Sequence, residues 1–283
     1  MRTAFFPIII LFFCYSCTSN PLWNDGYKTE ENLSGRIVLE SLSSETKTFV
    51  WLEEFDIHTY TNDQGDFSIV LNDFSENISG SLNIYFFVHN YLLDSVAVNF
   101  TNGRLSSNQS HLDNNGTLFE TVYLKKVLSC VTDHQSDLNI IESNNPSIDY
   151  TINVHKSAYV SKYNFIMADS ISSSSGLIFY NLISGLKVLH RFSKVNGDGI
   201  LIQDQLYPLE IEIGEELTWT YLIDPNQLSL SDGEYEVYPY FKIEHSYLPT
   251  GLVNALGGAN MFDFHEDYLN LPCDLEVARL TVN

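Results

Sequence analysis

Residue types that bind metal ions are concentrated near the C-terminus of the chain. Asp263, His265, Glu266 and Asp267 fall within five consecutive residues. Imidazole and carboxylate groups together suit a divalent cation. In an extended strand Asp263, His265 and Asp267 would share one face, whereas a helix would separate them. The spacing therefore predicts a candidate metal site at these three residues, with a solvated acidic loop as the alternative.

The motifs that mark common hydrolases and nucleotide-dependent enzymes are absent from the sequence. It contains no His-Glu-x-x-His, no Gly-x-Ser-x-Gly and no P-loop. Acidic residues are plentiful, but no spacing between them indicates a glycosidase pair. We therefore expect no catalytic residue, no cofactor and no enzymatic activity. The alternative is a secreted hydrolase whose carboxylates come together only in the fold.

Aromatic residues are densest in one short region of the second half of the chain. The set consists of Tyr235, Tyr238, Tyr240, Phe241 and Tyr247. At alternating positions of a strand some of these rings must point outward. Outward rings can stack on sugars, while inward rings fill a core. The region is thus a candidate aromatic binding patch for glycans, with core packing as the alternative.

The N-terminus has the organisation of a secretory signal. A basic residue precedes the apolar run Ala4–Phe13, which is too short for a bilayer span of about 20 residues. Cys17 directly follows the small Ser16, an arrangement that resembles the lipobox of bacterial lipoproteins. Cys14 stands where that motif prefers a leucine-like residue. The resemblance implies a signal peptide over residues 1–16 and lipidation of Cys17, with an ordinary cleaved signal as the alternative.

Lipidation would place the protein in the cell envelope, held to a membrane by its lipid anchor. Thr18 and Ser19 carry no acidic inner-membrane retention signal, which favours the outer membrane. Residues 17–32 are polar and read as a flexible tether.

Overall charge limits the classes of partner. The chain of 283 residues has 36 acidic against 14 basic side chains, a net charge of -22. Nucleic acid is excluded as a partner, because phosphate binding needs clustered Lys and Arg. The acidity is typical of a soluble exported protein. A hydrophobic content of 44% is ample for a folded core.

Two cysteines remain beside Cys17 once the signal peptide is removed. They are Cys130 and Cys273. An exported chain meets an oxidising compartment, in which the two could form a disulfide. Closing so long a loop would stabilise the fold by about 5 kcal/mol in the chain-entropy model. Two separate buried thiols are the alternative.

The pattern of apolar residues predicts an all-β protein. Leu209–Ile213 and Leu217–Tyr221 alternate apolar and polar residues, as half-buried strands do. Turn clusters such as Asn62–Gly65 and Asn114–Gly116 separate the strands. A polar linker at residues 131–147 divides two β-sandwich domains, residues 33–130 and 148–283.

The first domain contains the most specific motif of the chain. Residues 59–69 read Thr-Tyr-Thr-Asn-Asp-Gln-Gly-Asp-Phe-Ser-Ile. Together with the opening strand at residues 34–38, this resembles the hairpin of carboxypeptidase regulatory-like (transthyretin-like) domains. We expect Asp63 to cap the turn, Gly65 to adopt a positive φ and Phe67 to enter the core. Ca²⁺ binding by Asp63 and Asp66 is the less favoured alternative to a plain turn.

The resemblance departs from the family at two points, one of which is a loop at residues 72–81 that is longer than in the simplest members. Asn90 precedes Tyr91, where the family usually has glycine. Members of the family are mostly non-catalytic sandwiches attached to enzymes, transporters or surface lipoproteins, which implies a spacer or recognition role. Residues 148–283 resemble an immunoglobulin-like accessory domain, with Trp219 and then Gly233-Glu234-Tyr235 on successive strands.

Taken together, the sequence predicts a non-catalytic cell-envelope lipoprotein. Its role would be that of a surface binding or adaptor module for a glycan or an envelope partner protein. A secreted hydrolase and a purely structural envelope protein are the alternatives.

Overall fold

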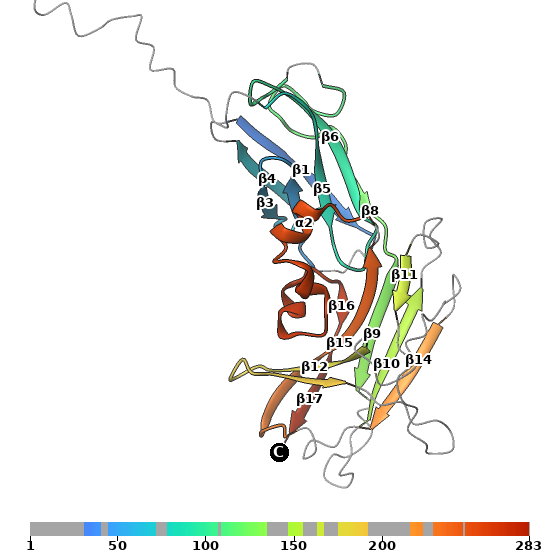
Figure 1. The fold of residues 1–283 in the computed structure, drawn as a ribbon. Helices are drawn as coiled ribbons and strands as arrows, with labels where there is room; N and C mark the ends of the chain where they lie inside the picture. Colours follow the sequence, from blue (N-terminus) through green and yellow to red (C-terminus); the bar gives the residue numbers. More distant parts are fainter. Residues whose placement is uncertain are drawn as a thin grey trace, which may run out of the picture.

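The chain is almost entirely β-structure, as the sequence predicts (Figure 1). The computed structural model describes residues 31–40, 45–71, 78–106, 109–134, 147–154, 163–166, 175–191, 216–222, 229–245 and 247–282. The predicted signal peptide at residues 1–16, Cys17 and nearly all of the predicted tether at residues 17–32 lie outside these ranges. In the part of the chain that is described, no helix is long and apolar enough to cross a membrane.

The first half of the chain folds into two packed sheets. One sheet has the order β4-β1-β8 and consists of β4 (Asp66–Leu71), β1 (Glu31–Leu39) and β8 (Val122–Leu124). The other has the order β3-β2-β5-β6-β7 and consists of β3 (Ile57–Tyr60), β2 (Phe49–Leu52), β5 (Gly80–Phe87), β6 (Asp94–Thr101) and β7 (Arg104–Leu105). Only the β1–β8 pair is parallel among these neighbours.

Strict alternation builds the core between these sheets. In β4, Phe67, Ile69 and Leu71 are buried while the residues between them are exposed. They pack against Val50 and Leu52 of β2 within one apolar cluster. One face of each strand therefore closes the sandwich, as period-two patterning requires.

The β3–β4 hairpin keeps two of the three roles predicted for it. Gly65 has φ +82°, and a Cβ there would lie 2.1 Å from the carbonyl oxygen of Ile37. The Gly65 carbonyl accepts from the Ile37 amide at 2.8 Å, which ties the turn to β1. Phe67 is buried in the core. Gly65 therefore serves both the turn and the close approach of two backbones.

The cap of this turn is Asn62, which corrects the prediction for Asp63. Asn62 Oδ1 accepts from the amides of Gln64 and Asp66, both at 2.9 Å. Asp63 points to solvent and forms an ion pair with Lys47 at 3.3 Å. An Asn or Asp side chain bonds most readily to the amide two residues ahead, so the first polar residue of the turn takes that role.

The second half of the chain builds two further sheets. The sheet of order β14-β10-β9-β16 consists of β14 (Glu216–Leu222), β10 (Ser147–Val154), β9 (Leu128–His134) and β16 (Leu275–Glu276). The other sheet has the order β11-β15-β12-β13, and β17 also pairs with β15. Its strands are β11 (Tyr163–Ile166), β15 (Gly233–His245), β12 (Ser175–Asn181), β13 (Lys187–Arg191) and β17 (Ala278–Val282).

The division between the halves differs from the prediction. Residues 131–134 were expected in a linker, but they belong to β9, which pairs with β10 from Leu128 to His134. The second half therefore begins at Leu128, and only residues 135–146 of the predicted linker remain, outside the described residues. The expected strand at Leu217–Tyr221 lies within β14, while Leu209–Ile213 falls outside the described residues.

A C-terminal segment covers the outer face of the first sandwich. Residues 248–274 contain α2 (Thr250–Ala255) and two 3₁₀ helices (Ala259–Phe262 and Glu266–Asn270), and we call them the C-terminal cap (Figure 1). One apolar cluster joins Phe49, Trp51 and Phe87 of β2 and β5 to residues of this cap. The cap members that are buried there are Leu252, Leu256, Met261, Tyr268 and Leu271.

Contact between the cap and β2 is closest at Trp51. A Cβ on Gly251 of α2 would lie 2.6 Å from the Trp51 ring, so only glycine lets the helix approach this closely. The indole N–H donates to Asp56 Oδ1 at 3.2 Å. The two halves of the chain therefore share a continuous core.

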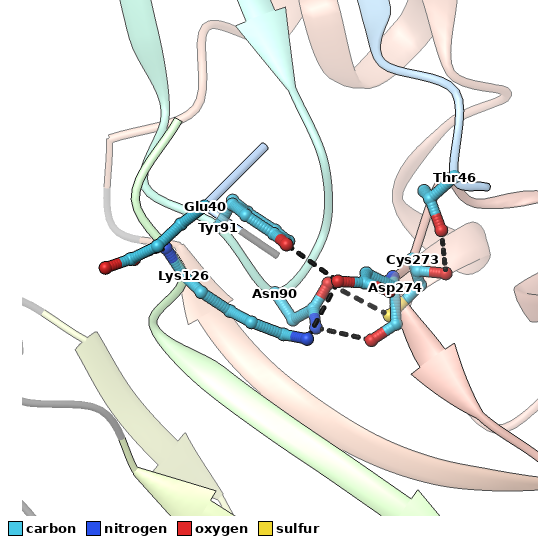
Figure 2. A network of polar contacts seen from close by, with 7 residues as sticks. All are labelled: Glu40, Thr46, Asn90, Tyr91, Lys126, Cys273 and Asp274. Atoms are coloured by element: carbon cyan, nitrogen blue, oxygen red, sulfur yellow. Dashed lines mark hydrogen bonds and ion pairs between the residues drawn. The ribbon is translucent and has the colours of Figure 1, made fainter. Parts of the chain in front are cut away.

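The side chain of Asn90 binds the backbone of Asp274, the last residue of the C-terminal cap (Figure 2). The Asn90 side chain donates to the Asp274 carbonyl at 2.8 Å and accepts from the Asp274 amide at 2.9 Å. Next to it, the His89 amide donates to the Pro272 carbonyl at 2.6 Å. An amide side chain thus pairs with both backbone groups of one residue, as a neighbouring strand would.

A buried charge pair lies beside this contact (Figure 2). Lys126 Nζ lies 2.7 Å from Asp274 Oδ2, and both side chains are close to nine-tenths buried. The Tyr91 hydroxyl donates to the same oxygen at 2.7 Å. The carboxylate therefore has a charged and a neutral donor, which compensates for its removal from water. We call Asn90, Tyr91, Lys126 and Asp274 the interdomain clamp.

Substitution of Gly65 tests the link between the hairpin and β1. Gly65→Ala is expected to lower the free energy of unfolding by at least 2–3 kcal/mol, through a positive φ and a clash with backbone. Gly80→Ala is the matched control, because Gly80 also has a positive φ but no atom lies within 4 Å of its Cβ position. Urea denaturation measures the free energy of unfolding of both variants. Equal losses would show that the close approach contributes nothing.

Substitution of Asn90 tests the clamp. Asn90→Ala leaves a buried amide and a buried carbonyl of Asp274 without their side-chain partner, for which we expect a loss of about 2–4 kcal/mol. Asn83→Ala is the control, since Asn83 makes only long, partly exposed contacts to Glu53 and Tyr85. A change below 0.5 kcal/mol on chemical denaturation of Asn90→Ala would rule out this role.

Candidate functional site

A pocket opens at the corner where β3 turns into β4. Its volume is about 530 Å³, within the range of small-ligand sites. We call this pocket the Tyr60 corner. It is lined by Lys47, Thr59, Tyr60, Thr61, Asn62, Asp66, Phe67 and Ser68.

A second hollow adjoins the same hairpin. It has a volume of about 260 Å³ and shares Thr61 and Asn62 with the Tyr60 corner. Arg36, Glu45 and Asp63 contribute charged groups to it. The hairpin therefore contributes to two neighbouring hollows, each rich in hydrogen-bonding side chains.

The ring of Tyr60 forms the apolar part of the corner. It is 45% exposed and is supported at its edge by Phe49, with ring centroids 5.2 Å apart. Phe49 and Tyr60 are directly opposite each other in the β2–β3 register, which fixes this contact. Burial raises the pKa of the Tyr60 hydroxyl. A tyrosine hydroxyl is protonated at neutral pH in any case and can donate a hydrogen bond.

Charged groups around the corner occur in opposite pairs. Lys47 pairs with Asp63 at 3.3 Å, and Arg36 pairs with Asp66 at 3.9 Å. All four side chains are at least half exposed, so these pairs add little to stability. They matter for the choice of ligand, because the two pairs cancel and leave the corner without net charge.

This geometry suits an uncharged ligand that has both an apolar face and many hydroxyl groups. A rigidly supported phenol ring offers a stacking surface. The side chains of Asn62, Thr59 and Ser68 offer donors and acceptors of hydrogen bonds around it. A sugar ring has the matching chemistry.

The sequence prediction did not single out Tyr60. It lies within the hairpin motif, just before the turn residues that the motif identifies. Exposed His58 and Tyr60 alternate with partly buried neighbours in β3, and this alternation is the signal that identifies an outward ring.

The predicted metal site is not formed. Within the described ranges, no three His, Cys, Asp or Glu side chains gather as metal ligands. The prediction required an extended strand, whereas residues 266–270 form a 3₁₀ helix. His265 precedes this helix, accepts from the Asp267 amide and lies 3.0 Å from the Asp267 carboxylate. His265 thus caps the start of this 3₁₀ helix, Asp267 lies in its first turn, and Asp263 is exposed before it.

The predicted aromatic patch is also corrected in part. Tyr235 is buried in the core of the second half, and Tyr240 is buried in the cluster under the C-terminal cap. Tyr238 is half-buried and donates to Glu236 at 2.7 Å. Tyr247 is 72% exposed, while the side chain of Phe241 lies outside the described part. Apolar clusters pack on both faces of β15, so Tyr235 and Tyr240 fill cores.

The two cysteines approach each other in the fold. Leu275 of β16 pairs with Cys130 of β9, which places Cys273 two residues from that pair. Cys273 has a free thiol, which donates to Asn90 Oδ1 at 3.6 Å. Burial raises the pKa of this thiol. Since the Cys273 thiol is free, the predicted disulfide with Cys130 is not formed in this structure, which has the alternative of an unpaired thiol at Cys273.

Exposed aliphatic side chains also gather at the tip of the β12–β13 hairpin. Ile183 is 84% exposed, and Leu182 and Leu186 are exposed beside it. Asn181 Oδ1 accepts from the amides of Ile183 and Ser184, which holds the tip in one conformation. This tip is a second surface that could contact a partner.

Comparison with known proteins gives only distant likenesses. The sequence matches no protein-family model and no curated protein. A Bacteroides uniformis protein named a "putative carbohydrate binding protein" has a TM-score of 0.38 and 10% identity, over 89% of this chain and 98% of that one. A DUF3823 family protein of Bacteroides ovatus has a TM-score of 0.30 and 11% identity, over 76% and 96% of the two chains. Such TM-scores are too low to bear on function.

Thiol reactivity tests the state of Cys273. In the folded protein the thiol is expected to react slowly with Ellman's reagent at pH 8, because it is buried and protonated. Unfolding in guanidinium without reductant should expose the thiol to the reagent. If the unfolded protein, with Cys17 replaced by serine and the signal peptide removed, still shows no reactive thiol, then Cys130 and Cys273 form a disulfide.

Proposed function

We propose that this protein is a non-catalytic binding module that recognises a neutral glycan at the Tyr60 corner. The observation that carries the proposal is the half-exposed Tyr60 ring, fixed by Phe49 and surrounded by hydroxyl, amide and paired charged groups. Apolar and polar groups converge there in the way expected of a small-ligand site.

The location proposed for this activity is the cell envelope. The support is the signal-like N-terminus and its lipobox-like Cys17. A lipid on Cys17 would hold the module at a membrane, the outer one if the cell has two. In this arrangement the module would retain a glycan at the cell surface and need no catalytic group of its own.

A glycan also fits the charge of the protein better than the other partner classes that the sequence suggests. The net charge of -22 disfavours nucleic acid and anionic lipid headgroups, but it does not affect a neutral sugar. An envelope protein is the remaining partner class. The aliphatic tip at Ile183 is the surface that would serve it.

Glycan binding tests the proposal directly. The chain from residue 17 onward, with Cys17→Ser, is run in affinity electrophoresis through gels of cellulose derivative, starch, laminarin, xylan or mannan. We expect retardation by at least one of them. Tyr60→Ala should weaken that binding about tenfold or more, and Tyr60→Phe should keep most of it, because the ring supplies the stacking surface.

Tyr247→Ala is the matched control, since Tyr247 is an exposed tyrosine of the other half of the chain. Its mobility should equal that of the unmodified chain. Retardation that is the same in Tyr60→Ala would place the glycan elsewhere. No retardation by any of the five polysaccharides would overturn the proposal and direct attention to a protein partner at Ile183.

A further inference from the structure

We infer, resting on the proposed function, that the ligand is an extended polysaccharide that runs from the Tyr60 corner across the outer face of the β4-β1-β8 sheet. Two exposed rings, Tyr123 and Phe119, would hold its far end. The ligand is thus a chain of several sugar units and not a single sugar.

The corner is continuous with this face of the sheet. Asp66 and Ser68 line the pocket and belong to β4, where the alternating Phe67, Ile69 and Leu71 point into the core. Asp66 and Ser68 therefore lie on the opposite, solvent-facing side. A ligand that leaves the corner past these two residues arrives on the outer face of the sheet.

The register shows what lies along that path. Arg36 and Ser34 of β1 stand opposite Asp66 and Ser68 of β4. Val38, two residues beyond Arg36, stands opposite Tyr123 of β8. With strands about 4.8 Å apart and about 3.3 Å per residue, Tyr123 lies about 12 Å from Asp66 across the face. That span is greater than one sugar ring can bridge.

Tyr123 and Phe119 are unusually exposed for aromatic side chains, at 68% and 65%. They are four residues apart in the chain segment that runs parallel to β1. Thr117, two residues before Phe119, contacts the Ser34 hydroxyl at 3.0 Å. Rings and hydroxyl groups thus share one surface, which gives a ligand both stacking and hydrogen bonds.

Charge and polarity favour a neutral glycan over a protein on this face. The charged residues near its centre, Arg36 and Asp66, pair with each other. Glu120 and Thr121 separate Phe119 from Tyr123 in the chain, and Val70 of β4 adds an exposed aliphatic side chain to the face. A flat surface with separated rings suits a linear chain whose units repeat the same apolar face and hydroxyl edge.

Chain length provides the test. The polysaccharide that binds in the gels is replaced by its disaccharide and its hexasaccharide, and calorimetry measures the affinity for each. We expect the hexasaccharide to bind at least tenfold more tightly. Tyr123→Ala should reduce hexasaccharide affinity about tenfold and leave disaccharide affinity unchanged, and Phe119→Ala should act in the same direction.

The outcomes separate this inference from the proposed function. Tyr60→Ala should weaken both ligands, while Tyr247→Ala should weaken neither. Equal affinity for the two lengths, or full hexasaccharide affinity in Tyr123→Ala and Phe119→Ala, would overturn the inference and leave the single-sugar site at Tyr60 intact. If the unmodified chain binds no glycan, both the inference and the proposed function are overturned. Because Tyr123 and Phe119 are mostly exposed, their variants are expected to fold.

Discussion

The architecture depends on burying a sheet that is apolar on both faces. Every residue of β2, Phe49 to Leu52, is buried. Val50 and Leu52 face the first sandwich core, whereas Phe49 and Trp51 face the C-terminal cap. An antiparallel sheet usually keeps one face in water. Here the second face is closed by residues roughly 200 positions later in the chain, so the two halves must form a joint core.

The interdomain clamp gives this joint core its register. Apolar packing alone tolerates sliding, because it is not directional. Asn90 instead pairs with the two backbone groups of Asp274, and Lys126 and Tyr91 meet the Asp274 carboxylate. Removing one partner of such a buried pair costs more than the pair contributes. The same residue that departs from the regulatory-like pattern thus determines where the C-terminal cap is held.

A rigid scaffold of this kind leaves function to its surface. The Tyr60 corner lies at the edge of the first sandwich, on the hairpin that Gly65 fastens to β1. Tyr60 itself packs on Phe49, whose ring also belongs to the core under the cap. The proposed site is therefore coupled to the interface between the two halves through a single side chain. A ring held in this way loses little conformational entropy when a ligand stacks on it.

The sequence by itself determined the all-β class, the β3–β4 hairpin with Gly65 and Phe67, and the absence of recognisable catalytic motifs, because period-two patterning and turn chemistry are local. It did not determine the partners of residues far apart in the chain. Asp263, His265 and Asp267 failed as a metal site because a 3₁₀ helix begins at Glu266 and takes Asp267 out of the extended backbone that the site required. Tyr235 and Tyr240 became core because apolar clusters pack on both faces of β15. Only the tertiary structure decided that Tyr60 is an exposed ring over a pocket and that Asn90 binds Asp274, since both depend on long-range packing.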